Sequence, residues 1–261
     1  MNVKHKSLML LANLAGFIVM ITLNGLANAL PINGVTTREL SDAYPNLFVP
    51  AGLTFSIWGL IYLLLLAFLI KQMVDVFNNK DTEYLDKIGW WFALSSLANA
   101  GWILAWHHRQ VFLSVIIMLF LLKCLVSIYH NLDIGRSAAG RPVKYLVHLP
   151  FSVYLGWITI ATIANITAWL VDIGWGRFGL SEEFWTACMI ILGAGLTLLV
   201  LYTRYDIFFS LVILWAFAGI YIKRTSVGME AFPVIVTTVL IATAIIAAAI
   251  VHQMTRGKWY H

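Results

Sequence analysis

The chain has 261 residues, of which 61% are hydrophobic and only 11% are charged, and its mean hydropathy is +0.85. A soluble domain has about 45–50% apolar and about 25% charged residues, so this composition excludes a soluble globular protein. It indicates instead an all-α polytopic membrane protein, because one bilayer span needs about 20 mostly apolar residues. The net charge of +5 is modest and predicts no nucleic-acid partner, because Lys and Arg in membrane proteins are placed mainly by topology.

Eight apolar stretches predict eight membrane-spanning helices. In chain order they are residues 7–31, 49–71, 88–106, 110–129, 145–171, 184–202, 207–222 and 232–254. The second stretch contains Pro50 near its start, where proline suits the first turn of a helix. The seventh stretch is the shortest, and we expect Lys223 and Arg224 at its end to extend their charged groups to the membrane interface.

The distribution of positive charge predicts the orientation of the chain. Most of the 17 Lys and Arg residues fall on the side of the expected spans that carries both termini. Because cytoplasmic loops carry the excess of Lys and Arg, both termini are expected in the cytosol. The expected location is a bacterial plasma membrane. An even number of spans agrees with this arrangement.

The polar side chains expected at membrane depth are uncharged and accompany aromatic ones. Trp58 and Tyr62 share a helix face, as do Asn99 and Trp102. In the fifth stretch, aromatic, amide or small side chains recur every four positions and form one stripe. They are Trp157, Ala161, Asn165 and Trp169. Asn in hydrocarbon needs a hydrogen-bond partner, so the two Asn residues should face the bundle interior. By spacing alone these faces fit either helix packing or a ligand pocket.

These residues resemble the motifs of the tryptophan-rich sensory protein family (TspO/MBR, or translocator protein). Pro50 followed by Ile57-Trp58 and Tyr62 is similar to the family's P…VWxxLY segment. Asn99 to Trp102 is similar to its NxLW. The segment that begins at Tyr154-Leu155-Gly156-Trp157 resembles YLAWxxxATxxNxxxW, with every spacing kept. Ser114 stands where the family commonly has an acidic residue.

The resemblance implies a TspO-like five-helix transmembrane bundle over residues 1–176, with residues 177–261 as an additional three-helix membrane segment. It also implies an integral membrane binding or sensory protein for flat hydrophobic small molecules. Porphyrins, haem or other tetrapyrroles are the candidate ligands, no cofactor is required, and no metal site or catalytic residue is expected. The segment 32–48 would cover the pocket. The candidate ligand-binding residues are Trp58, Tyr62, Asn99, Trp102, Tyr154, Trp157, Ala161, Asn165 and Trp169.

Two other functions stay open at this point. A transporter of a small or lipid-like solute would use the additional helices, with Gly193 and Gly195 interrupting the sixth span. A tetrapyrrole-degrading enzyme is the other alternative.

The small residues Ala93, Ser96 and Ala100 indicate close helix packing on the third span. This stripe suits either a homodimer or contact with another helix of the same chain.

Overall fold

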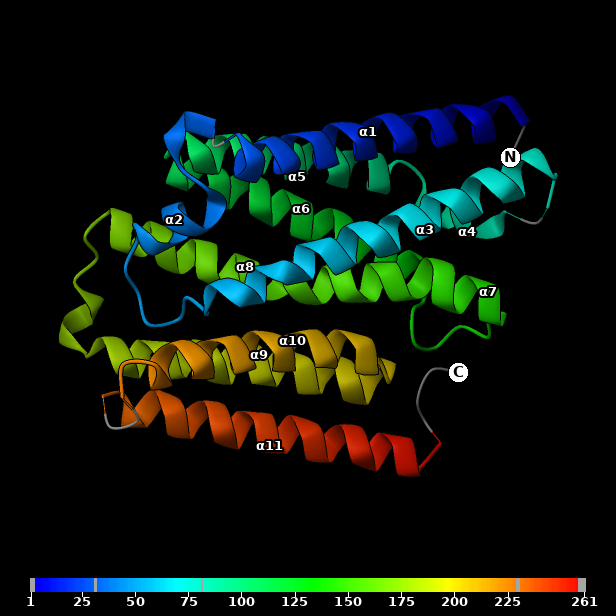
Figure 1. Ribbon diagram of the computed structural model, residues 1–261. Coiled ribbons are helices and arrows are strands. Elements are labelled where there is room, and N and C mark those ends of the chain that lie inside the picture. Colours follow the sequence, from blue (N-terminus) through cyan, green and yellow to red (C-terminus); the bar gives the residue numbers. More distant parts are fainter. Residues whose placement is uncertain (1–2, 31, 81, 229–230, 258–261) are drawn as a thin grey trace.

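The apolar stretches form long helices that run side by side in alternating directions (Figure 1). The computed structural model describes residues 3–30, 32–80, 82–228 and 231–257. The start of the first helix and the end of the last lie at the same end of the bundle (Figure 1). The long helices are α1 (Val3–Ala29), α3 (Ile57–Phe77), α5 (Trp91–His107), α6 (Val111–Asn131), α8 (Leu149–Asp172), α9 (Glu182–Arg204), α10 (Ile207–Thr225) and α11 (Pro233–Thr255).

Short helical elements connect the long helices. They are η1 (Ile32–Gly34), α2 (Thr37–Asp42), η2 (Gly52–Ser56), α4 (Glu83–Ile88), α7 (Arg141–Val143), the π-helical turn η3 (Lys144–His148) and η4 (Arg177–Gly179).

Seven helices within the described residues are long and apolar enough to cross a membrane, so the chain is an integral multi-pass protein but the expected count of eight spans is not supported. The exception is α5, whose 17 residues rise only about 25 Å against a hydrocarbon core of about 30 Å. The expected span 88–106 is shortened because Gly89, with φ +54°, ends α4 in a conformation that breaks the helix. By contrast α10, the shortest expected span, extends to 19 residues and meets the length.

Two expected helix features differ in the structure. The regular α-helix of the second span begins only at Ile57, after the 3₁₀ helix η2. Pro50 therefore lies before the helix and not in its first turn. The helix α9 continues through Gly193 and Gly195 without a break, which corrects the expected interruption. A Cβ at Gly193 would lie 3.2 Å from Cδ1 of Ile160, so this glycine allows α9 to approach α8 closely. Pro31, the expected end of the first span, lies outside the described residues.

The segment 32–48, expected as a loop, is partly helical and packs onto the bundle. Thr36 and Glu39 form a capping box at the start of α2, in which Thr36 Oγ1 accepts from the Glu39 backbone N–H at 3.3 Å and the Glu39 carboxylate accepts from the Thr36 backbone N–H at 2.8 Å. Leu40, Tyr44 and Phe48 bury their side chains beneath the segment. The segment is therefore a folded cover over one end of the bundle.

The helix α10 connects the last three helices to the first five. A Cβ at Gly156 of α8 would lie 3.1 Å from the Phe209 carbonyl oxygen, so the two helices are in close contact. Asp206, buried at the start of α10, accepts hydrogen bonds from the Tyr129 hydroxyl at 2.8 Å and the Ser152 hydroxyl at 2.6 Å. These two hydroxyls come from α6 and α8, so one carboxylate joins three helices.

The small residues of α5 contact another helix of the same chain. Ala93, Ser96 and Ala100 are buried, and a Cβ at Gly16 of α1 would lie 3.2 Å from the Ser96 Cβ. Of the two expected uses of this stripe, the structure shows contact with another helix of the same chain. Leu97, one turn after Ala93 and at the edge of this stripe, is exposed. It belongs to the apolar outer surface that contacts the bilayer.

Candidate ligand pocket

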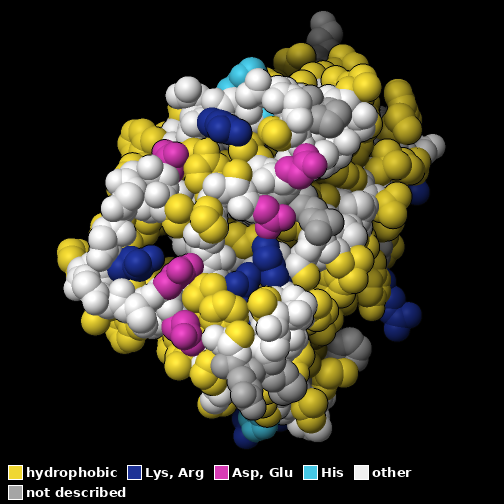
Figure 2. Space-filling view, turned by 60° about the vertical axis from the view of Figure 1, so that its left-hand side comes forward, with side chains coloured by type: hydrophobic (Ala, Val, Ile, Leu, Met, Phe, Trp, Pro, Cys, Tyr) yellow, Lys and Arg dark blue, Asp and Glu magenta, His cyan; other side chains and the backbone are white. Residues whose placement is uncertain are grey.

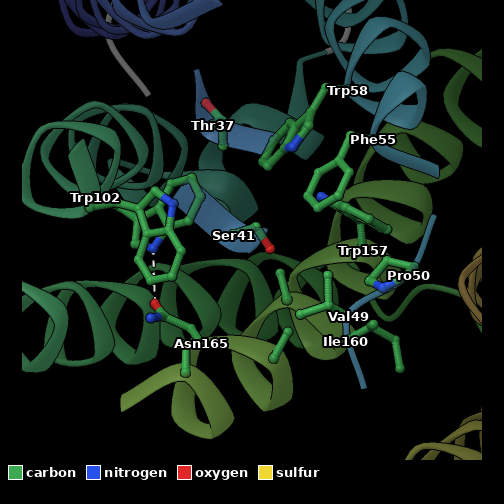
Figure 3. A pocket seen from close by; sticks show the side chains of 14 residues that line it. Thr37, Ser41, Val49, Pro50, Phe55, Trp58, Trp102, Trp157, Ile160 and Asn165 are labelled. Carbon is green, nitrogen blue, oxygen red and sulfur yellow. Dashed lines mark hydrogen bonds between the residues drawn. The ribbon is translucent and has the colours of Figure 1, made fainter. Parts of the chain in front are cut away.

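A pocket lies beneath the cover segment, between α3, α5 and α8 (Figure 3). Trp58 from α3, Trp102 from α5 and Trp157 from α8 stand on its walls, with Ala161 and Asn165 of α8 on the same side as Trp157. The space open to the centre of a water molecule is about 60 Å³. The remaining lining residues are Thr37, Ser41, Val49, Pro50, Phe55, Trp106, Ile160, Ala164 and Ala168.

Asn165 fixes one wall of the pocket through hydrogen bonds to two other helices. Its amide oxygen accepts from the indole Nε1 of Trp102 at 2.9 Å, a bond drawn in Figure 3. Its amide nitrogen donates to Ser114 Oγ at 2.9 Å, and the Ser114 hydroxyl donates to the Val111 carbonyl at 2.7 Å. Each polar group is therefore used inside the bundle, and the Trp102 ring is held in one orientation.

Trp58 belongs to a cluster of aromatic rings that extends from the pocket to Tyr62. Tyr62 stacks on Trp58 with 5.6 Å between ring centroids, and the Trp157 ring meets Trp58 edge-on at 6.2 Å. Phe55 also meets Trp157 edge-on at 6.1 Å. The indole Nε1 of Trp157 is buried and has no hydrogen-bond partner within the described protein. A buried indole N–H usually has a partner, so this donor is available to an acceptor that enters the pocket.

Asn99 and Tyr154 lie together but do not line this pocket. The Asn99 amide nitrogen donates to the Tyr154 hydroxyl at 2.9 Å, and its amide oxygen accepts from the Asn24 side chain at 2.7 Å. All three side chains are buried. They form a network that joins α1, α5 and α8.

Tyr62 and Trp169, also expected in the site, lie elsewhere. Tyr62 lines a second cavity of about 370 Å³ that borders α1 and includes Asn24 and Asn28 in its wall. The two cavities share the lining residues Thr37, Phe55, Trp58 and Trp102. Trp169 packs against Phe112 of α6 at 5.2 Å, outside both cavities.

The cover is fastened to the bundle by His107 at the end of α5. Its Nδ1 lies 3.2 Å from the Ile32 carbonyl oxygen, which only accepts, so Nδ1 carries the proton. In the neutral ring Nε2 then accepts from the Thr37 hydroxyl at 3.0 Å. Asn33 adds a bond from its side-chain nitrogen to the His107 carbonyl at 3.1 Å.

Several lining residues were not predicted, although two kinds of signal pointed to them. Trp106 follows Trp102 by four positions, and Ala164 and Ala168 follow Ala161 by three and seven, so these residues continue the same helix faces. No helix spacing in the sequence predicts that Ser41 and Val49 line the pocket, because their positions depend on the path of the cover segment.

The sequence matches the family of TSPO-like proteins over residues 10–252. The chain belongs to this family. The match extends across α9 to α11, so these helices lie inside the family region. No curated protein and no solved structure matches the sequence.

Proposed function

We propose that this TSPO-like protein binds a flat hydrophobic small molecule, such as a porphyrin or another tetrapyrrole, between Trp58, Trp102 and Trp157. The observation that carries the proposal is the buried Nε1 of Trp157, a donor without a partner on the wall of an aromatic pocket. Indole rings offer large flat surfaces for stacking, and a ligand carbonyl or carboxylate would accept from this N–H.

The volume of the pocket requires a movement when a large ring binds. Small-molecule sites usually have about 300–1,000 Å³, far more than the space beside Trp157. The adjoining cavity of about 370 Å³ lies across the wall formed by Thr37, Phe55, Trp58 and Trp102. A rotation of the Trp58 side chain would join the two spaces. The ligand would then stack among rings from α3, α5 and α8.

Binding or sensing fits the lining better than catalysis or transport. The described side chains around the pocket are apolar or uncharged, and none is an acid or a base suited to proton transfer. The uninterrupted α9 removes one of the two features that favoured a transporter, the helix break at Gly193 and Gly195, and leaves the additional helices.

A titration of protoporphyrin into the detergent-purified protein tests the proposal. Saturable quenching of Trp fluorescence is expected, and Trp157→Phe should weaken affinity up to about tenfold, because the indole stacking and its N–H are lost. Trp169→Phe is the matched control, because its ring packs on Phe112 outside the cavities. Equal affinities of the wild type and Trp157→Phe would reject Trp157 as a ligand contact.

The orientation and assembly of the chain are parts of the same proposal. With both termini in the cytosol of a bacterial cell, the cover segment would lie at the opposite membrane face. A homodimer through α5 would use the exposed face at Leu97, because Ala93 is buried against α1. A cysteine at Leu97 should crosslink in native membranes and one at Ala93 should not. Crosslinking from neither position would reject the dimer.

A further inference from the structure

Arg224, at the end of α10, is a buried cation without an ion-pair partner. Only 7% of its surface is exposed, so its side chain is covered by the protein. Its Nε has no hydrogen-bond partner in the described protein, and its Nη2 lies 3.5 Å from the Val49 carbonyl oxygen. No carboxylate among the described residues forms an ion pair with it. Its guanidinium carbon also lies 5.5 Å from the centroid of the Phe232 ring. A guanidinium is always charged and is rarely buried without an anion in direct contact, so Arg224 has donors that an entering anion could use.

The neighbouring charged groups already have partners of their own. Arg224 lines a cavity of about 440 Å³ under the cover segment, together with Lys223, Asp42 and Glu182. Figure 2 shows acidic and basic side chains gathered at this end of the molecule. Lys223 pairs with Asp42 at 2.6 Å. Glu182 accepts from the Leu47 backbone N–H at 2.9 Å and lies 3.9 Å from Arg177. Both carboxylates are near enough to act electrostatically on Arg224, but their ion pairs are with Lys223 and Arg177.

The cavity of Arg224 adjoins the aromatic pocket. Ser41 of the cover and Val49 directly after it line both spaces, so the two cavities share a wall. In Figure 3 the Ser41 hydroxyl is directed into the aromatic pocket. A ligand whose flat ring lies between the Trp residues would need only a short flexible arm beside Ser41 to bring a charged group to the guanidinium.

We propose that Arg224 binds a carboxylate of the pocket ligand, so that the protein selects flat acids over neutral molecules of the same shape. This inference rests on the proposed function. The inference specifies the chemical class of the ligand, namely a ring system that carries a carboxylate on a short alkyl chain. The guanidinium offers planar paired donors that match a carboxylate, and the cover backbone closes the site around them.

Protoporphyrin and its dimethyl ester test this selection, because they share the ring and differ in the negative charges. Trp quenching by each is measured with the purified protein in nanodiscs of phosphatidylcholine. The wild type should bind the acid about tenfold more tightly than the ester, and Arg224→Gln should lose this factor for the acid alone, because a charge-assisted hydrogen bond is removed. Arg109→Gln is the matched control, since this exposed arginine follows His107 at the same end of the bundle and does not line the Arg224 cavity.

The outcomes separate the inference from the function on which it rests. Equal binding of acid and ester by the wild type overturns the selection, and this comparison needs no variant to fold. Equal weakening of both ligands in Arg224→Gln also overturns it, because the residue would then act only on the structure. If the preference disappears in nanodiscs that contain phosphatidylglycerol, the cavity binds a lipid phosphate and the inference is wrong. In these three cases sensitivity to Trp157→Phe still supports the pocket, whereas absence of quenching by either ligand rejects the proposed function itself.

Discussion

At the scale of single residues, the buried amides divide into two roles that their sequence context does not distinguish. Asn165 holds Trp102 on the wall of the pocket, whereas Asn99 joins Asn24 and Tyr154 in the interior of the bundle. The requirement that Asn at membrane depth has a partner predicts that both face inward. It does not say which partner each one finds, because that depends on the rotation of neighbouring helices.

This division predicts different effects of two similar substitutions. Asn165→Leu leaves the Trp102 N–H without a partner, and an unsatisfied buried group costs about 1–3 kcal/mol. The Ser114 oxygen loses the donor from Asn165 but keeps its bond to the Val111 carbonyl. Asn99→Leu has a similar cost in stability but does not touch the pocket. We expect both variants to lower the thermal midpoint and only Asn165→Leu to weaken protoporphyrin quenching. An equal loss of affinity in Asn99→Leu would contradict the assignment.

Asp206 predicts a dependence of stability on pH. Burial raises the pKa of its carboxyl above the ordinary value, and hydrogen bonds from Ser152, Phe209 and Tyr129 offset only part of the rise. Because the pKa is higher in the folded chain, the group contributes stability that is fully present below the ordinary Asp pKa of about 3.9 and is lost as pH rises through the folded-state pKa. The thermal midpoint of Asp206→Asn should therefore fall less than that of the wild type over this range.

Thermal melts at several pH values check the Asp206 prediction. Asp86→Asn is the control, because Asp86 is exposed and its removal should leave the slope unchanged. Identical slopes for Asp206→Asn and the wild type would show that the carboxyl has the same pKa in the folded and unfolded chain.

At the scale of elements, apolar length predicts the long helices well and their ends less well. Gly89 shortens the third expected span through its left-handed conformation, which hydropathy does not record. The four-residue spacing of α8 correctly groups Trp157, Ala161 and Asn165, but each step advances about 40° beyond a full turn. After three steps Trp169 has turned about 120° and contacts α6 instead of the pocket.

The cover segment could be located by the sequence but its attachment could not. His107, Glu182 and Lys223 come from α5, α9 and α10, and no local pattern connects them with residues 32–48. These contacts hold the cover from both sides. Opening of the pocket therefore requires the cover to break some of them.

His107→Ala tests the control of the pocket by the cover. Loss of its bonds to Thr37 and Ile32, each worth about 0.5–1.5 kcal/mol, should speed amide hydrogen exchange in residues 32–48 about tenfold. Binding and release of protoporphyrin should also become faster. His108→Ala serves as the control, because this neighbouring histidine is exposed. Unchanged exchange in the cover would show that the remaining contacts are sufficient to hold it.

At the scale of the whole molecule, α9 to α11 are more than an appended unit beside the pocket. The helix α10 contacts α8 at Gly156, provides Asp206 for α6 and α8, and carries Lys223 and Arg224 to the cover. The family match includes these helices. The aromatic walls, however, come from η2, α3, α5 and α8, which precede residue 176. The last helices would thus support the cover and supply the charge, while the first five form the aromatic site.

A chain that ends at Gly176 tests this separation of roles. We expect it to insert, because the first five long helices and the cover are complete, and to place its C-terminus at the opposite end of the bundle from the start of α1 (Figure 1). Its thermal midpoint should fall, because Tyr129 and Ser152 lose Asp206. It should still show saturable Trp quenching by protoporphyrin, since the aromatic walls are present. Without Arg224 it should bind protoporphyrin and the dimethyl ester with equal affinity. Degradation of this chain, or insertion without binding, would show that α9 to α11 are needed to complete the fold or the pocket.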